Sequence, residues 1–345
     1  MKFLKYLFLI LGCIIWAISV SPPLFRLVGN WHLVHDGYQY GDLFRLSTLS
    51  EFRDPRIQCE GYTPPARVPT DKKIHLYIIG DSFTEKGRVG KKDFPVDHYT
   101  YVKWSDFLHI KTDTSELNVL LLESVERHFR QKMVSRVNVL IPDTATFETK
   151  FESPRLLGQL DDALKASFTA DRLDGLLFQN DLFLTLKSWK ADFNQKVFDK
   201  VSTKVTLVNN DQDMVYYMDT DTPNVTSAFS EVSNTEIDTI VMNLNQSREF
   251  ADSLGFDHVI LSIIPNKVSV VSPDYGHYNQ LIERVYAHPK LQIPHIDVLS
   301  DFRKMGRHSY QKGDSHWTCD GQYLWLNKVN ALINKLIIEN GKPNS

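Results

Sequence analysis

The 345-residue sequence contains only three cysteines, and none of them belongs to a C-x-x-C pair. A zinc ribbon and a thioredoxin-like redox site are therefore not expected. The net charge is −3, so the chain lacks the overall basic field that is typical of nucleic-acid-binding proteins. Repeats of solenoid length and low-complexity tracts are also missing from the sequence. No set of side chains suggests a metal or another cofactor.

The cysteines that are present allow one disulfide. Cys13 lies in an apolar N-terminal segment, whereas Cys59 and Cys319 lie in the polar remainder of the chain. If that remainder is exported, Cys59 and Cys319 could pair. The sequence alone leaves both states open, because it does not fix the distance that a disulfide needs.

The N-terminus has the pattern of a targeting segment. Lys2 and Lys5 precede the apolar stretch YLFLILGCIIWAISV, residues 6–20. This pattern fits a cleaved signal peptide or a short membrane anchor. We favour an uncleaved anchor, because Pro22 is awkwardly placed for cleavage. The positive-inside rule then keeps the lysines in the cytoplasm and exports the chain after about residue 24, towards the periplasm or cell exterior.

The remaining pattern alternates between strands and helices, which predicts an α/β fold. We expect a mostly parallel sheet with helices on both faces and a β-hairpin insertion. The expected organisation is an anchor or signal at 1–24, an irregular linker at 25–72 and one α/β domain at 73–340. Within it we expect strands at 73–80, 136–142, 174–181, 258–265 and 296–299, helices at 115–133, 234–254, 279–288 and 321–338, and a hairpin at 204–219.

The stretch YIIGDSFTEKG, residues 77–87, ends an apolar run at a serine. Binding and catalytic residues of parallel sheets lie at the carboxyl ends of the strands, so Ser82 is a candidate nucleophile. The alternative is that Gly80 makes a turn and Ser82 caps a helix. Asp81 is expected to tie down the turn, and it is also a candidate for the substrate cleft.

A second stretch, KGDSHWTCDG at 312–321, offers a base and its partner. Residues two apart in an extended loop point the same way, so Asp314 can hold one nitrogen of His316 while the other faces Ser82. The alternatives are a turn aspartate and a histidine packed beside Trp317. Trp317 is expected to pack or to form a wall of the site.

A third stretch, LLFQND at 176–181, places Asn180 after an expected strand. Its amide could donate to an oxyanion together with the backbone N–H of Ser82. The alternative is a plain turn. Further candidates for the substrate cleft are the loop residues Asn266 and Lys267, and the aromatic residues Tyr99, Tyr101 and Trp104, which could stack on sugar rings.

The arrangement resembles the SGNH, or GDSL-type, hydrolase superfamily. The matching residues are Asp81–Ser82, Asn180–Asp181, and Asp314 with His316. The spacing from aspartate to histidine is one residue shorter than in that pattern, and VLIPDTATF at 139–147 lacks the expected glycine.

The motif GDSHWT is similar to the Asp-x-His-Trp motif of the alginate O-acetyltransferase-like proteins, although here the serine precedes the histidine. This resemblance implies a membrane-anchored, exported serine O-acyltransferase or esterase that acts on O-acetyl groups of a polysaccharide. It also implies a membrane acyl-donor protein as a partner and no cofactor. The alternative is a non-catalytic protein of the same fold that binds or scaffolds glycan assembly.

Overall fold

The computed structural model describes residues 2–31, 36–142 and 168–340, and these form two compact units. Of the described residues, unit 1 contains those up to Arg56 and those from 168 to Ser202. Unit 2 contains those from Ile57 to 142 and those from Thr203 to 340. Unit 2 holds the large sheet. The domain boundaries expected at residues 24, 72 and 340 stay predictions.

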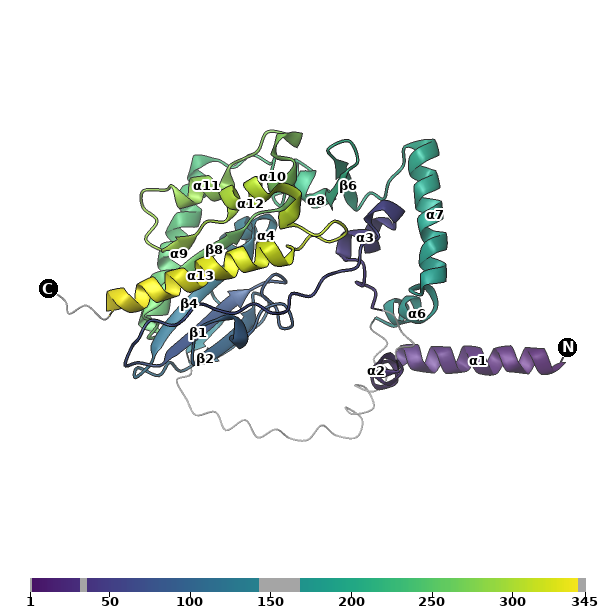
Figure 1. The fold of residues 1–345 in the computed structure, drawn as a ribbon, viewed down its shortest axis with the longest axis horizontal. Coiled ribbons are helices and arrows are strands. Elements are labelled where there is room, and N and C mark those ends of the chain that lie inside the picture. Colours follow the sequence, from purple (N-terminus) through teal and green to yellow (C-terminus); the bar gives the residue numbers. More distant parts are fainter. Residues whose placement is uncertain (1, 32–35, 143–167, 341–345) are drawn as a thin grey trace. The chain divides into compact units, whose positions relative to one another are not determined.

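The core of unit 2 is a five-stranded sheet in which every neighbouring pair is parallel (Figure 1). The order is β2-β1-β4-β8-β9, so the chain moves in opposite directions on the two sides of β1. An α/β fold with a parallel sheet is therefore confirmed. The strands are β1 (Ile74–Gly80), β2 (His98–Lys103), β4 (Leu117–Val125), β8 (His258–Ile264) and β9 (His295–Ile296).

The expected helix at 115–133 is wrong over most of its length, because residues Leu117–Val125 form the central strand β4. Every residue of β4 is buried, as expected for a strand covered on both sides. A continuous apolar run satisfies helical and strand patterns equally well, and here strand pairing with β1 and β8 decides. Only the end of the segment is helical, as α4 (Glu126–Lys132).

Two expected strands are also corrected. The strand expected at 174–181 is instead the end of α6 (Thr169–Phe178) and the start of α7 (Asp181–Phe198), both in unit 1. The strand expected at 136–142 is reduced to β5 (Leu140–Pro142), which pairs with β3 (Leu108–Ile110) outside the large sheet.

The second half of unit 2 follows the expected order more closely. The hairpin consists of β6 (Val205–Val208) and β7 (Asp213–Tyr216), which pair antiparallel. The Ser233 hydroxyl accepts a hydrogen bond from Glu236 N at 3.0 Å and caps α9. The helices of this half are α8 (Tyr217–Thr220), α9 (Asn234–Ser253), α10 (Lys267–Val271), α11 (Leu281–Tyr286), α12 (Leu299–Met305) and α13 (Cys319–Asn340).

The closing helix α13 runs across the strands of the large sheet (Figure 1). Its buried Trp325 donates a hydrogen bond from Nε1 to Ser262 Oγ of β8, at 2.9 Å. Cys319, the first residue of α13, forms a disulfide with Cys59, with a Cα–Cα distance of 5.2 Å. The pairing left open by the sequence is therefore present, and Cys13 is free and exposed.

Unit 1 is helical in its described part. It contains α1 (Lys2–Val20), α2 (Pro22–Asn30), α3 (Asp42–Ser47), the 3-10 turn η1 (Ser50–Phe52), α6 and α7. The segment at 25–72 is thus less irregular than expected. Among the described residues, α1 is the one helix long and apolar enough to cross a membrane, and it could be an anchor or a signal sequence.

Candidate active site

The turn after β1 presents Ser82 at the carboxyl end of the large sheet. Ser82 is exposed, whereas Phe83 and Thr84 beside it are buried. The sheet order reverses at β1, and such a reversal opens a crevice between the loops that leave neighbouring parallel strands. The sequence therefore places a solvent-accessible hydroxyl where an α/β sheet accommodates ligands.

Three predicted residues meet at this point. The Ser82 hydroxyl lies 2.8 Å from His316 Nε2, and His316 Nδ1 lies 2.5 Å from Asp314 Oδ1. His316 is 7% exposed and Asp314 is 2% exposed. A serine, an imidazole and a carboxylate thus form one hydrogen-bonded chain with only the serine open to solvent. This is the geometry of an activated nucleophile with its base and orienting group.

The charge of Asp314 fixes the proton on His316. Burial opposes ionisation of this carboxyl, but the hydrogen bonds from the side chain and the backbone N–H of His316 help to outweigh burial and lower the pKa of Asp314 below its usual value. An ionised carboxylate only accepts hydrogen bonds, so Nδ1 of His316 carries the proton. Nε2 is then an acceptor for the Ser82 hydroxyl, as a general base must be.

The loop that carries Asp314 and His316 is a short hairpin-like segment. Tyr310 and Trp317 form an antiparallel bridge, and Gln311 N donates to the His316 carbonyl at 3.0 Å. Trp317 is buried between Phe83, at a ring distance of 5.0 Å, and Trp325, at 5.3 Å. Trp317 therefore anchors the loop in the core.

Lys267 supports the same loop from inside the protein. Its buried ammonium donates to the carbonyls of Gln311 at 2.7 Å, Lys312 at 3.0 Å and Asp314 at 3.2 Å. Three carbonyls from one turn around one ammonium hold the backbone of Asp314 in place. The structure thus assigns Lys267 a position behind the triad.

Asn266, the residue before Lys267, is fully buried. Its Oδ1 accepts a hydrogen bond from Arg127 N at 3.0 Å, and its backbone N–H donates to Glu126 Oε2 at 2.8 Å. Ser269 Oγ donates to the same carboxyl oxygen at 2.6 Å. Burial raises the pKa of Glu126 to about 7, and these hydrogen bonds only partly oppose that shift.

The nucleophile turn is tied to β4 through Glu123, a fully buried carboxyl in the middle of the sheet. Glu123 Oε2 accepts hydrogen bonds from Asp81 N at 3.0 Å and from Thr84 Oγ1 at 2.7 Å. Gly80 lies against this pair: a Cβ there would come within 2.1 Å of Thr84 Oγ1 and 2.9 Å of Glu123 Oε2. Only glycine leaves room for this arrangement.

Asp81 ties down the turn, as its sequence predicted. Its carboxylate accepts from Phe83 N at 3.1 Å and from Val125 N at 2.8 Å, and Lys132 Nζ lies 3.3 Å away. Burial disfavours the charge, but Lys132 and the backbone donors outweigh it and lower the pKa of Asp81. Burial, together with the charge of Asp81, raises the pKa of Glu123 well above its usual value. The pKa values of the two neighbouring carboxyls are therefore pushed apart, with Asp81 favoured in its charged form and Glu123 in its neutral form.

The aromatic residues Tyr101 and Trp104 contact the frame of the site. The Tyr101 hydroxyl donates to the Asp81 carbonyl at 2.8 Å, and Trp104 Nε1 donates to the Glu123 carbonyl at 2.6 Å. Tyr99 of β2 packs against Phe94 with a ring distance of 5.8 Å, and burial raises its pKa. These contacts support the turn, and stacking on sugar rings stays a prediction.

Asn180 occupies a different structural context from the expected one. The predicted strand at 174–181 is wrong, because Asn180 is the N-cap of helix α7 in unit 1. Its Oδ1 accepts from Phe183 N at 3.1 Å, and its Nδ2 donates to the Leu177 carbonyl at 3.2 Å. Both ends of the amide are thus used in capping.

Two residues of the site were missed from the sequence. Glu123 and Thr84 fix the turn, yet neither was a candidate. A signal existed for Glu123: it is the one charged residue in the run LNVLLLESV, and a charge on a buried strand needs partners. The helical interpretation of 115–133 concealed it.

Comparisons with known proteins add no relative: no family model, curated protein or solved structure matches the chain. The superfamily suggested by the motifs therefore stays a prediction, and the function has to be argued from the site.

Proposed function

We propose that the protein is a serine O-acyltransferase or esterase in which Ser82 forms an acyl-enzyme. The observation that carries this proposal is the 2.8 Å contact between Ser82 Oγ and His316 Nε2, with Asp314 on the opposite ring nitrogen. The sheet order supports an SGNH-like fold, because counting the five strands along the chain gives 2-1-3-4-5, the flavodoxin-like order.

The first half of the reaction transfers an acyl group to the protein. Ser82 Oγ attacks the ester carbonyl while His316 Nε2 takes its proton, and Asp314 stabilises the imidazolium. The tetrahedral intermediate then breaks its bond to the alkoxy oxygen, which leaves as an alcohol with the proton from His316. The backbone N–H of Ser82 suits the oxyanion, since no described residue accepts a hydrogen bond from it.

The second half releases the acyl group. His316 Nε2 removes a proton from an incoming hydroxyl, whose oxygen attacks the carbonyl of the acyl-serine. The bond between the acyl carbon and Ser82 Oγ then breaks, the acyl group leaves on the acceptor oxygen, and His316 returns the proton to Ser82 Oγ. Water as the acceptor gives an esterase, and a sugar hydroxyl gives an acyltransferase. Both outcomes use the same triad.

The substrate class and location rest on further observations. The Asp-x-His-Trp resemblance supports O-acetyl groups of an exported polysaccharide. The apolar helix α1 is consistent with an anchor or a signal, and the Cys59–Cys319 disulfide is typical of proteins outside the reducing cytoplasm. We therefore propose that unit 2 faces the periplasm or the cell exterior.

The test uses the full chain in detergent or nanodiscs with a chromogenic acetyl ester. Ser82→Ala, His316→Ala and the double variant should lose activity to a similar extent, on the order of 10⁴-fold or more, because the triad acts as a unit. Ser105→Ala is the matched control, because among the described residues the hydroxyl of this exposed serine of unit 2 donates only to the neighbouring Asp106. It should retain full activity.

A fluorophosphonate reagent gives an independent readout. It should add mass at Ser82 in the folded chain and not in His316→Ala. Full activity of Ser82→Ala, or a reagent that ignores Ser82, would overturn the enzyme proposal in favour of glycan binding or scaffolding.

A further inference from the structure

Helix α7 carries an apolar stripe that no described residue covers. The stripe consists of large side chains spaced by three and four residues, which places them on one helix face. Their exposed fractions range from 46% to 68%, which is unusual for a run of side chains of this size. The members are Leu182, Leu186, Trp189, Phe193 and Val197.

The opposite face of α7 is fixed to the rest of unit 1. Leu184 and Ser188 are buried there. Asp192 on an adjoining side accepts hydrogen bonds from the backbone N–H of Ser50 at 3.0 Å and from its hydroxyl at 2.5 Å. Arg53 donates to Thr185 at 2.9 Å. These contacts fix the rotation of α7 about its own axis, so the apolar stripe faces away from the other described residues of unit 1.

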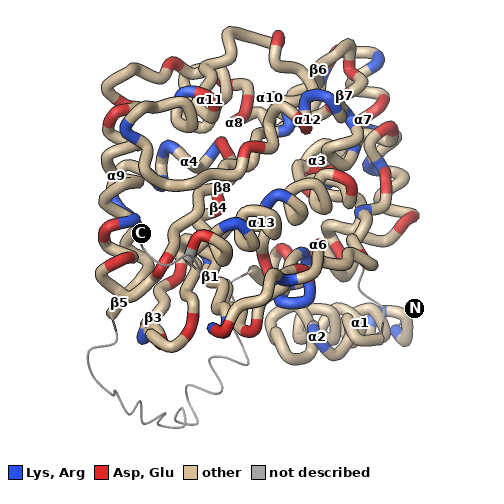
Figure 2. The backbone as a smooth tube through the Cα atoms, turned by 60° about the vertical axis from the view of Figure 1, so that its left-hand side comes forward, with Lys and Arg blue, Asp and Glu red and all other residues tan. Residues whose placement is uncertain are grey.

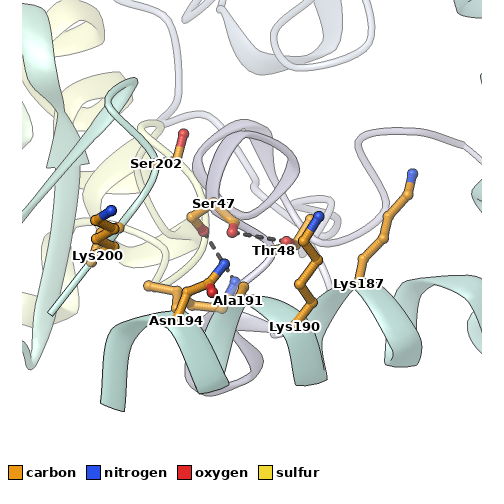
Figure 3. Close-up of a pocket in the computed structure, with 10 residues that line it drawn as sticks. Ser47, Thr48, Lys187, Lys190, Ala191, Asn194, Lys200 and Ser202 are labelled. Atoms are coloured by element: carbon orange, nitrogen blue, oxygen red, sulfur yellow. Dashed lines mark hydrogen bonds between the residues drawn. The ribbon is translucent and has the colours of Figure 1, made fainter. Parts of the chain in front are cut away.

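Lysines also occur along α7, at residues 187, 190 and 196, and Figure 2 draws lysine positions of the backbone in blue. By helix geometry, Lys190 and Lys196 lie on either side of the apolar stripe. One flank opens into a pocket of ≈ 370 Å³ lined by Lys187, Lys190 and Lys200, with Ser47, Thr48 and Asn194 supplying polar groups (Figure 3).

The charge of this pocket is incompletely balanced. Lys187 forms an ion pair with Asp174 at 3.3 Å. Lys190 and Lys200 form no ion pair with another described residue. The pocket therefore suits an anion, and it lies beside a surface that suits hydrocarbon.

We propose that α7 lies in the interface of an anionic bilayer, with its stripe among the acyl chains and the lysine pocket against lipid phosphates. A helix with Trp, Phe and Leu on one face and lysines beside them is the pattern of an interfacial helix. The long stems of the lysines allow their ammonium groups to reach the headgroups.

Continuity with α1 favours a bilayer over a protein partner. Helix α1 belongs to the same unit and is the candidate membrane span. In Figure 1, α7 runs crosswise to α1 and level with its C-terminal end, so α7 would lie along the membrane plane if α1 crosses it. Leu24, Leu27 and Trp31, just after α1, are exposed as well and extend the apolar surface.

The test places a fluorophore on the stripe of the full chain in vesicles of phosphatidylcholine and phosphatidylglycerol. Cys13→Ser removes the free thiol, and the paired Cys59 and Cys319 do not react. Trp189→Cys is then labelled with a polarity-sensitive dye, and Thr239→Cys, exposed on α9 of unit 2, is the matched control. Lipids with a spin label on the acyl chain serve as quenchers.

The dye at residue 189 should shift to the blue and lose most of its emission to the lipid quencher, whereas the dye at residue 239 should change little. Leu186→Asn with Phe193→Asn should abolish both effects at residue 189. A dye that stays open to a water-soluble quencher, or is shielded without lipid quenching, would overturn the proposal. Shielding without lipid quenching would mean that protein covers the stripe.

A second arm tests the lysine pocket and its source of phosphate. Lys187→Gln with Lys190→Gln and Lys200→Gln should remove the dependence of quenching on phosphatidylglycerol. The same change at three exposed lysines of unit 2, Lys86, Lys111 and Lys335, should not. Excess inorganic phosphate should leave the quenching intact. Displacement by inorganic phosphate, or indifference to the pocket substitutions, would refute the lipid contact.

Discussion

The close approach at Gly80 gives a sharp prediction for Gly80→Ala. The added Cβ would lie 2.1 Å from Thr84 Oγ1, 2.9 Å from Glu123 Oε2 and 3.2 Å from Tyr101 Cε2. Separations below 3.0 Å are essentially never observed for a Cβ, so at least two of these neighbours must move. All of them belong to the frame that holds the Ser82 turn.

The cost follows from what holds those neighbours in place. Thr84 and Glu123 are fully buried and joined by a 2.7 Å hydrogen bond, and Glu123 also binds Asp81 N. Overpacking of this kind costs about 1–3 kcal/mol. Breaking a buried hydrogen bond adds roughly 1–3 kcal/mol. We expect the free energy of unfolding to fall by about 3 kcal/mol, and kcat/KM to fall on the order of 10²-fold, because a shift of about 1 Å at Ser82 is enough for that loss.

The assays are denaturant unfolding and hydrolysis of the chromogenic acetyl ester. Gly90→Ala is the matched control, because a Cβ at Gly90 meets no atom within 4 Å and its backbone is extended, with φ −160°. It should change neither quantity.

A double variant tests the mechanism itself. Thr84→Ala removes the atom of the 2.1 Å clash, so Gly80→Ala should cost less in that background than in the natural one. Equal costs in both backgrounds, or a Gly80→Ala protein as stable and active as Gly90→Ala, would refute this account of the turn.

Three further predictions concern the surroundings of the site. Lys267→Met should lower kcat roughly 10-fold or more, because the carbonyls of the Asp314 loop lose their common hydrogen-bond donor. The circular dichroism spectrum should stay unchanged, and an unchanged kcat would exclude a positioning role for Lys267. Burial raises the pKa of Glu126 to about 7, so the folded state keeps a proton that the unfolded state loses near pH 4.5. The free energy of unfolding should therefore fall by up to about 3 kcal/mol as the pH rises from about 4.5 to 7. Glu126→Gln should flatten this part of the unfolding profile, and an unchanged slope would contradict the buried proton. Cys59→Ser should reduce the free energy of unfolding by on the order of 4 kcal/mol, whereas Cys13→Ser should leave it unchanged; equal stability of both would argue against the disulfide.

The parts of the fold that the sequence predicted are those whose local pattern excludes alternatives. The helix expected at 234–254 and the hairpin expected at 204–219 each have one structural solution, and both are present as α9 and the β6–β7 pair. The segment Leu117–Val125 does not, because its continuous apolar run suits a helix or a strand until neighbouring strands pair with it.

The same distinction applies to the site. Ser82, Asp314 and His316 were predicted to meet because the carboxyl ends of parallel strands share one edge, and they do meet. Asn180 depended on a third strand that is helical, so its premise was lost with that strand. Glu123, Thr84 and the exact position of Lys267 depend on contacts between distant segments, which no local pattern records.

The different exposure of the three triad residues indicates which kind of substrate the site can accept. Ser82 is open to solvent, while His316 and Asp314 are buried behind it and Lys267 and Glu123 hold the two supporting turns from within. The only reacting atom at the surface is thus the nucleophile, and its base is positioned before any substrate arrives. Such a site suits an ester that is presented from outside by a large molecule. An O-acetyl group on a polymer meets this requirement, because Ser82 needs access to one acetyl carbonyl and the site does not have to enclose the rest of the polymer. Soluble acetyl esters of increasing size should therefore react at similar kcat/KM, and a steep loss of kcat/KM with size would indicate a small, enclosed substrate instead.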